Sequence, residues 1–130
     1  MLKGKITLIN MWGTYCGPCI KEMPFLASLH KKYYEMDLQV VGLLIDIGSP
    51  GSINAQKKRT AEGLVEDAGV TYTSILPCAG LADFINSTEY IPYSVFVDQH
   101  GHQLGESITG SMSSSAWEKA IKNVIYTYMY

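Results

Sequence analysis

The sequence predicts an α/β protein with a central mixed β-sheet and helices on both faces. Two near-continuous apolar runs, 6–12 and 38–46, indicate strands buried on both sides, as in a parallel sheet. Segments with helical spacing follow both runs, and parallel neighbours need such crossovers. Two later runs, 93–97 and 103–109, flank a turn at 98–101 and predict an antiparallel hairpin.

The helices follow from apolar spacing and from their end signals. The first is expected over about 17–35, and Pro24 inside it predicts a kink. Its available apolar residues are Ile20, Met23, Phe25, Leu26 and Leu29. A loop rich in Gly, Ser and Pro at 48–52 precedes the second helix, which Gly69 is placed to end in a left-handed cap. That helix has the apolar stripe Ala61, Leu64, Val65 and Ala68.

The last third of the chain predicts shorter elements before one clear helix. Residues 70–76 indicate a short strand, and 81–85 indicate one or two helical turns. The final helix begins at Ser115, which forms a capping box with Glu118, or at the equally reasonable cap Ser113. Its stripe consists of Trp117, Ala120, Ile121, Val124, Ile125 and Tyr128.

Composition limits the classes of function. At 130 residues we expect a single domain over 1–130, long enough for a sizeable core. The net charge of −2 gives no electrostatic argument for nucleic acid or for an anionic membrane as a partner. The short basic run 57–59 is followed by acidic residues and indicates a solvated helix face. No apolar stretch reaches the ~20 residues of a membrane span, and we recognise no signal peptide.

The most informative motif is Cys16-Gly17-Pro18-Cys19, which lies between a predicted strand and a predicted helix. Two thiols at this spacing can form and reopen a small disulfide ring. Unpaired N–H groups at a helix N-terminus stabilise a thiolate, which is the nucleophile in disulfide exchange. The position of the motif and its chemistry therefore both indicate a redox centre.

The cysteines also admit other interpretations. A structural zinc half-site would need a second pair of ligands, but His30, His100 and His102 are scattered and Cys78 stands alone. Cys78 itself is either an inert, half-buried thiol, which we favour, or a third redox thiol that exchanges with the pair. Three cysteines are too few for a disulfide scaffold.

Segment 11–24 (MWGTYCGPCIKEMP) resembles the active-site segment of the thioredoxin superfamily, and most closely its TlpA/ResA-type branch, with the pattern W-x-x-x-C-x-P-C-x-x-E-x-P. Ile91-Pro92, just before a predicted strand, is similar to the place where this family has a cis-proline beside its dithiol. The hairpin turn before a final helix is a third match. The resemblance implies a thioredoxin fold over most of the chain.

By this resemblance, Cys16 is the exposed nucleophile and Cys19 the buried resolving thiol. Trp12 would shield the pair, and Pro24 would kink the active-site helix. A cis-Pro92 would line the substrate groove with Ile91, although an ordinary trans proline at a strand start is the alternative.

Two departures from the family pattern stand out. The buried Asp that thioredoxins carry six residues before the first Cys is replaced here by Asn10, which cannot ionise. Asp46 and Glu22 are the nearest candidates for proton transfer, although Glu22 is also readily interpreted as a solvated helix residue. The family's N-terminal β-hairpin is missing or trimmed, so the chain is expected to be a shortened fold or a piece of a longer, perhaps tethered, protein.

The resemblance implies a bacterial thiol-disulfide oxidoreductase that reduces protein disulfides and needs no cofactor or metal beyond its own disulfide. Its expected partners are protein disulfides and an electron-donating thiol protein, and its expected location is extracytoplasmic, with a monomeric state. A disulfide oxidant or isomerase, a thiol peroxidase of the peroxiredoxin-like branch, and a non-catalytic binding module are alternatives. The peroxidase needs a P-x-x-x-T-x-x-C pattern, but Thr14 lies two residues before Cys16 and no Pro precedes it.

Overall fold

The computed structural model describes residues 4–49, 51–76, 82–86 and 90–129. Its main sheet has five strands in the order β5-β2-β1-β6-β7. These are β1 (Ile6–Trp12), β2 (Leu38–Leu44), β5 (Ser74–Ile75), β6 (Tyr93–Val97) and β7 (Gln103–Thr109). Strands β5, β2 and β1 are parallel, whereas β6 and β7 are antiparallel to their neighbours. The predicted mixed sheet with one antiparallel edge is confirmed.

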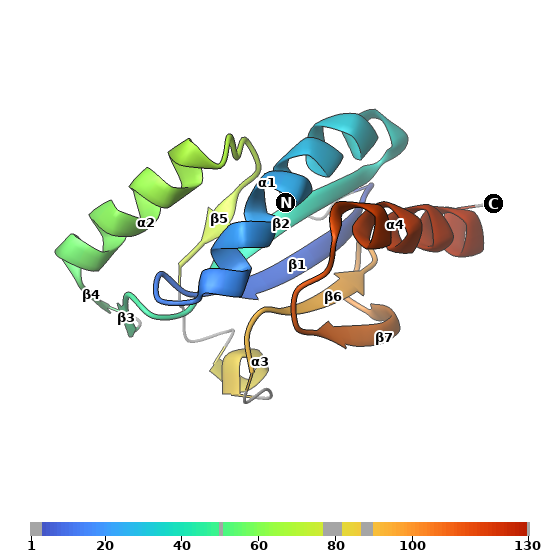
Figure 1. Cartoon of the computed structure of the whole chain (residues 1–130). Coiled ribbons are helices and arrows are strands. Elements are labelled where there is room, and N and C mark those ends of the chain that lie inside the picture. Colours follow the sequence, from blue (N-terminus) through green and yellow to red (C-terminus); the bar gives the residue numbers. More distant parts are fainter. Residues whose placement is uncertain (1–3, 50, 77–81, 87–89, 130) are drawn as a thin grey trace.

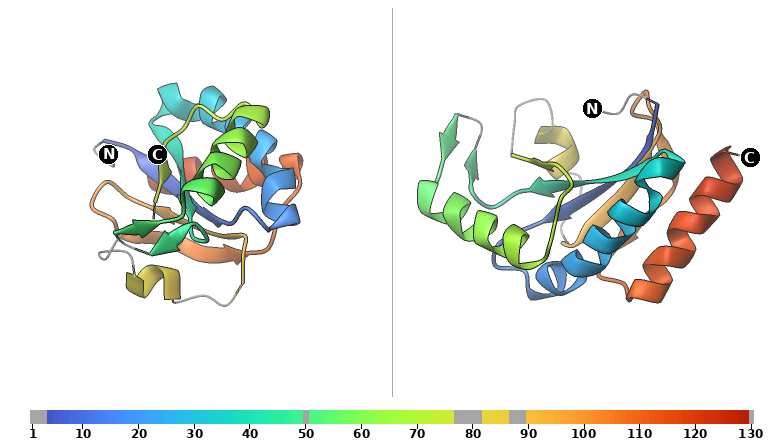
Figure 2. Two further views of the ribbon diagram at one scale, coloured as in Figure 1. Left: turned by 90° about the vertical axis from the view of Figure 1, so that its left-hand side faces the viewer. Right: turned by 90° about the horizontal axis from the view of Figure 1, so that it is seen from above.

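Helices lie on both faces of this sheet, but unequally (Figure 1). They are α1 (Gly17–Tyr33), α2 (Ala55–Asp67), α3 (Ala82–Asn86) and α4 (Ser114–Met129). Helices α1 and α4 run side by side over one face (Figure 2), where Lys32 of α1 pairs with Glu118 of α4 at 2.6 Å. The five-residue helix α3 lies on the opposite face, where Phe84 lines a hollow with Ile9 and Val95.

The main core lies between the sheet and the pair α1 and α4. The buried faces of β1 and β2 contribute Leu8 and Val40, and Trp117 and Ile121 of α4 are completely buried against them. Alternate residues of each strand face this core because side chains in a strand alternate between its two faces. This packing holds α1 at a defined place over the carboxyl end of β1.

The predicted strand at 70–76 is mostly wrong, because only Ser74–Ile75 pairs with β2. The backbone N–H of Gly42 in β2 donates to Thr73, but the equivalent N–H of Val40 donates instead to Nδ1 of His30, at 3.0 Å. A side chain of α1 therefore occupies the edge of β2 where the ladder would continue. Strand β2 also ends two residues earlier than predicted, at Leu44.

The loop predicted at 48–52 contains a small hairpin of two-residue strands, β3 (Gly48–Ser49) and β4 (Ser52–Ile53). The first helix ends as a short 3-10 turn, η1 (Tyr34–Met36). Pro24 lies inside α1, which continues through it, so the kink stays a prediction.

Several predicted end signals are present. Gly69 has φ +71°, as a left-handed cap requires. Of the two candidate caps for the last helix, Ser113 is correct, since its Oγ accepts the backbone N–H of Ala116 at 3.2 Å. The turn at 98–101 is closed by the N–H of Gly101 donating to the carbonyl of Asp98.

Candidate redox site

The two cysteines are joined in a disulfide at the start of α1, with their Cα atoms 5.3 Å apart. Cys16 is the N-cap of the helix and has an extended backbone, while Pro18 occupies the first turn, where its missing N–H costs nothing. The backbone N–H of Cys19 donates to Sγ of Cys16 at 3.2 Å. This N–H and the helix dipole would stabilise a thiolate on Cys16 once the disulfide is reduced.

The disulfide lies in an apolar cluster with Trp12, Met23 and Ala61. Cys19 is completely buried and Cys16 is 6% exposed. Cys16 is the more exposed of the two cysteines, as expected. It is nevertheless buried in this oxidised form, whereas an exposed Cys16 was expected. Ala61 belongs to α2, so that helix contributes to the cluster around the disulfide.

Asp46 fastens the loop that leads into Cys16. One carboxylate oxygen accepts the backbone N–H of Thr14 at 3.0 Å, and the other accepts its hydroxyl in a short hydrogen bond. Within the same loop, the N–H of Cys16 donates to the carbonyl of Gly13 at 3.1 Å. The geometry therefore connects Asp46 to the dithiol through the backbone of the loop.

The Ile91–Pro92 peptide bond is cis, as expected from the resemblance. In the antiparallel ladder of β1 and β6, the last pair is Met11 with Tyr93, so the register continues to Trp12 opposite Pro92. The Pro92 carbonyl accepts the N–H of Gly110 at 2.8 Å. The proline is thus held at the end of β1 that carries the dithiol.

Two partly or fully exposed side chains lie beside this end of the sheet. A Cβ on Gly13 would be 2.9 Å from the ring of Tyr15 and 3.2 Å from Cδ1 of Ile91, so both side chains lie against this glycine. Tyr15 is 71% exposed, and Ile91 packs partly against the cluster around the disulfide. Gly17 and Pro18 are also exposed. These residues form the accessible surface around Cys16.

The interpretation of Glu22 as a solvated residue is wrong, because it is 1% exposed. Its carboxylate accepts three hydrogen bonds: from Asn10 Nδ2 of β1 at 3.3 Å, from the backbone N–H of Met112 in the loop before α4 at 2.9 Å, and from Trp117 Nε1 of α4 at 2.9 Å. Asn10 also donates to the Ser94 hydroxyl of β6 at 2.9 Å. Three donors explain how a carboxylate is retained in the core.

Burial raises the pKa of Glu22, and the three donors act against that rise because they favour the charged form. Glu22 follows Cys19 by three residues, so the two side chains lie on the same face of α1, one turn apart. Burial also raises the pKa of Tyr72, as does the nearby Glu22 charge, so this phenol stays neutral at physiological pH. The site therefore holds a carboxyl whose protonation can change closer to neutral pH than usual.

Sequence reasoning missed the donors to Glu22. It assigned Trp117 to an apolar stripe and gave Met112 and Ser94 no role. The sequence did carry a signal, because Glu22 stands at helical spacing from apolar residues. These residues, which the structure shows to be buried together with Glu22, are Cys19, Leu26, Leu29 and Tyr33. A charged residue on such a stripe needs buried partners, and a buried indole N–H needs an acceptor.

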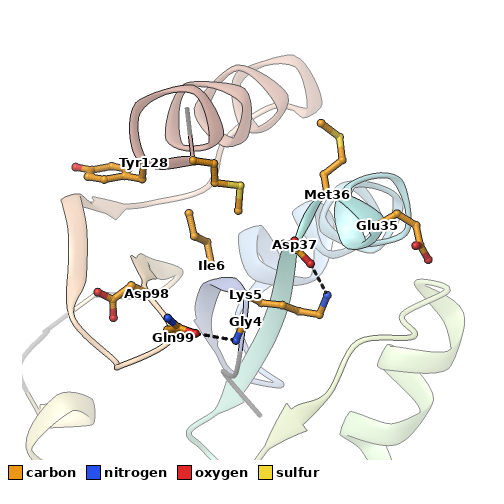
Figure 3. Close-up of a pocket in the computed structure, with 10 residues that line it drawn as sticks. Gly4, Lys5, Ile6, Glu35, Met36, Asp37, Asp98, Gln99 and Tyr128 are labelled. Atoms are coloured by element: carbon orange, nitrogen blue, oxygen red, sulfur yellow. Dashed lines mark hydrogen bonds and ion pairs between the residues drawn. The ribbon is translucent and has the colours of Figure 1, made fainter.

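A wide hollow in the described part of the chain lies away from the redox site. Figure 3 shows it at the start of β1, whereas the dithiol follows the end of that strand, and no cysteine is among its lining residues. Its walls carry the ion pair of Lys5 with Asp37, at 3.5 Å. A smaller hollow of about 340 Å³ reaches Pro18 of the dithiol motif. It is lined by Pro18, Lys21, Glu22, Phe25, Ser111, Met112 and Ser113.

Three further expectations concern the third cysteine, a metal and a membrane span. Cys78 lies outside the described residues. Among the described residues, no group of three or more His, Cys, Asp or Glu is arranged to hold a metal ion. No helix in the described ranges has the length and apolar character needed to cross a membrane.

Solved structures with the same fold cover most of the chain. A thioredoxin-family thiol:disulfide interchange protein from Chlorobium tepidum superposes with a TM-score of 0.78 at 22% identity, covering 95% of this chain and 82% of that one. StoA from Bacillus subtilis gives 0.70 at 20% identity, covering 90% and 82%. These likenesses confirm the thioredoxin fold.

Curated relatives agree in sequence. The thiol-disulfide oxidoreductase ResA of Geobacillus kaustophilus is 25% identical over 122 residues, which are 94% of this chain and 64% of the relative. ResA of Bacillus thuringiensis is 47% identical over 45 residues, or 35% and 26%. The chain thus spans less than two thirds of their length. The Redoxin family model matches residues 1–125, and the chain belongs to this family.

Proposed function

We propose that this chain is a thiol-disulfide oxidoreductase of the ResA type that reduces disulfides in other proteins. The observation that carries the proposal is the Cys16–Cys19 disulfide at the N-terminus of α1, with the Cys19 N–H directed at Sγ of Cys16. This arrangement favours a thiolate at Cys16, the less buried of the two cysteines, and a thiolate is required for attack on another disulfide.

The reaction starts from the reduced protein. The Cys16 thiolate attacks one sulfur of the substrate disulfide, whose second sulfur leaves and takes up a proton. The Cys19 thiol then loses its proton and attacks Sγ of Cys16, which releases the first substrate sulfur as a thiol. Two electrons have moved to the substrate, and the chain is left with the disulfide seen here. A dithiol partner must reduce it again.

Glu22 is the better candidate for accepting the Cys19 proton. It is buried one helical turn from Cys19, and burial raises its pKa towards the range in which a carboxyl can exchange protons near neutral pH. Both oxygens of Asp46 are engaged by Thr14, which supports a role in holding the loop instead.

The surface around Cys16 supports binding of an extended protein segment. Trp12 closes the buried side of the dithiol, while Gly17 and Pro18 leave its outer side open. Ile91 is partly exposed next to it, and Pro92 fixes the neighbouring backbone. Backbone groups beside the cis-proline would pair with the substrate, as in β-strand addition.

The cellular setting is part of the same proposal. We place the protein outside the cytoplasm of a bacterium, as a monomer served by an electron-donating thiol protein, with its own disulfide as the sole redox group. The match to bacterial ResA proteins supports this setting. The Gly-Pro pair between the cysteines favours the reducing direction over that of an oxidant or isomerase.

Reduction of insulin by dithiothreitol, followed by turbidity, tests the activity. We expect catalysis by the wild type and by Cys78→Ser, and none by Cys16→Ser. Cys19→Ser should accumulate a mixed disulfide through Cys16. Hydroperoxide turnover without insulin reduction would favour the peroxidase alternative, and inactivity in both assays would favour a binding module.

A further inference from the structure

The buried carboxylate of Glu22 is held chiefly from the last helix of the fold. One of its oxygens, Oε2, accepts both the Met112 N–H and Trp117 Nε1, each at 2.9 Å, whereas Asn10 reaches the other oxygen at 3.3 Å. The two short hydrogen bonds therefore come from the start of α4 and the loop before it. The active-site helix and the C-terminal helix meet at this carboxylate.

Trp117 is fixed independently of Glu22. Its side chain is completely buried in the main core, and its backbone N–H donates to the carbonyl of the helix cap Ser113 at 3.0 Å. The indole N–H consequently has little freedom to turn towards another acceptor. A rigid donor aimed at a buried carboxylate stabilises its ionised form.

The other groups that face Glu22 do not replace this donor. Its hydrogen-bond partners in the described part of the chain are all uncharged. Burial, together with the Glu22 charge, raises the pKa of the Tyr72 hydroxyl and keeps it neutral. Lys21 lines the same hollow but is exposed. The negative charge is therefore balanced by oriented dipoles, of which the indole is one of the two closest.

We propose that Trp117 is a positioning residue for the dithiol reaction, whose indole N–H holds the Glu22 carboxylate in its ionised form one helical turn from Cys19. This inference rests on the proposed function, in which Glu22 accepts the Cys19 proton. Through Trp117, the C-terminal helix sets the pH range in which the resolving thiol can react.

The test removes the N–H and leaves a large apolar ring. Carbon-detected NMR of the reduced and oxidised protein follows the titration of the Glu22 carboxyl. In Trp117→Phe, this carboxyl should titrate about one pH unit higher than in the wild type, because one charge-assisted hydrogen bond is lost. The acidic limb of the pH profile for substrate reduction should move in the same direction. Unchanged titration and an unchanged limb would overturn the proposal.

Two controls separate the hydrogen bond from packing. Ile121→Ala removes buried volume from the same helix without touching Glu22, so it should lower stability and leave the titration unchanged. If Trp117→Phe fails to fold, benzothienylalanine can be incorporated at position 117, where it replaces only the indole N–H by sulfur. This substitution should raise the titration midpoint of the Glu22 carboxyl by the same amount. A shift as large in Ile121→Ala would contradict the proposal.

Failure of the proposed function is distinguishable from failure of this inference. If the wild type shows no Cys16-dependent reduction, the proposed function is wrong, while the carboxyl titration still reports on the indole. If reduction occurs but Trp117→Phe still shifts the limb in a Glu22→Gln background, Trp117 acts by another route and the inference is wrong.

Discussion

Replacing Asp46 distinguishes a loop clamp from a proton carrier. In Asp46→Ala, the Thr14 N–H and hydroxyl both lose their acceptor. Both bonds are only part-buried, so water recovers some of the loss, and we expect a cost of about 1 kcal/mol for each, or about 2 kcal/mol in total. For a domain of this size that is a fall of about 6–10 °C in the melting temperature.

The isosteric variant Asp46→Asn is the decisive comparison. Its amide oxygen still accepts the Thr14 N–H, and its amide group can donate to the hydroxyl oxygen. A clamp therefore predicts near-wild-type melting and insulin reduction for Asp46→Asn, with both impaired in Asp46→Ala. Calorimetry and the turbidity assay measure the two quantities. Equal loss of activity in both variants, with normal melting of Asp46→Asn, would refute the clamp and restore the proton-transfer role.

Four further outcomes concern Glu22, His30 and Gly48. Glu22→Leu leaves Trp117 Nε1 and the Met112 N–H without their acceptor and leaves Asn10 with Ser94 alone, so urea titration should show a loss of about 3–5 kcal/mol. Because burial raises the pKa of Glu22 in the folded state, wild-type stability should fall as pH rises through that pKa, a slope that Glu22→Gln removes. Burial lowers the pKa of His30, whose Nδ1 accepts the Val40 N–H. Because the unfolded chain then binds the proton more readily, stability should fall as the pH drops below about 6.5. In thermal melts, His30→Gln should show a smaller fall. Gly48→Ala should cost about 1–3 kcal/mol in urea titration, because Gly48 has φ +128° and an added Cβ would overlap the Ser52 carbonyl oxygen; wild-type stability would contradict this.

The strands and the dithiol were predictable because each is encoded by neighbouring residues. Apolar runs specify β1, β2 and β6, and a C-x-x-C pair before helical spacing places the redox centre at a helix start. The same locality explains the correct caps at Ser113 and Gly69. Such signals need no knowledge of what a segment packs against.

The errors concern contacts between distant segments. The environment of Glu22 depends on Trp117, 95 residues away, and no local pattern states which face of α1 the last helix covers. The strand predicted at 70–76 is short because His30, from another element, takes a backbone N–H at the edge of β2. Tertiary partners decided both outcomes, so propensity alone could not.

We propose that Cys16 and Cys19 form a reversible two-electron couple that reduces disulfides in other proteins. Equilibration of Cys78→Ser against glutathione or dithiothreitol, with quantification of free thiols, measures its reduction potential. We expect a reduction potential near the reducing end of the known range, about −250 mV or below. A value near about −150 mV would contradict the proposed direction of electron flow, and the absence of a reversible couple would contradict the redox function itself.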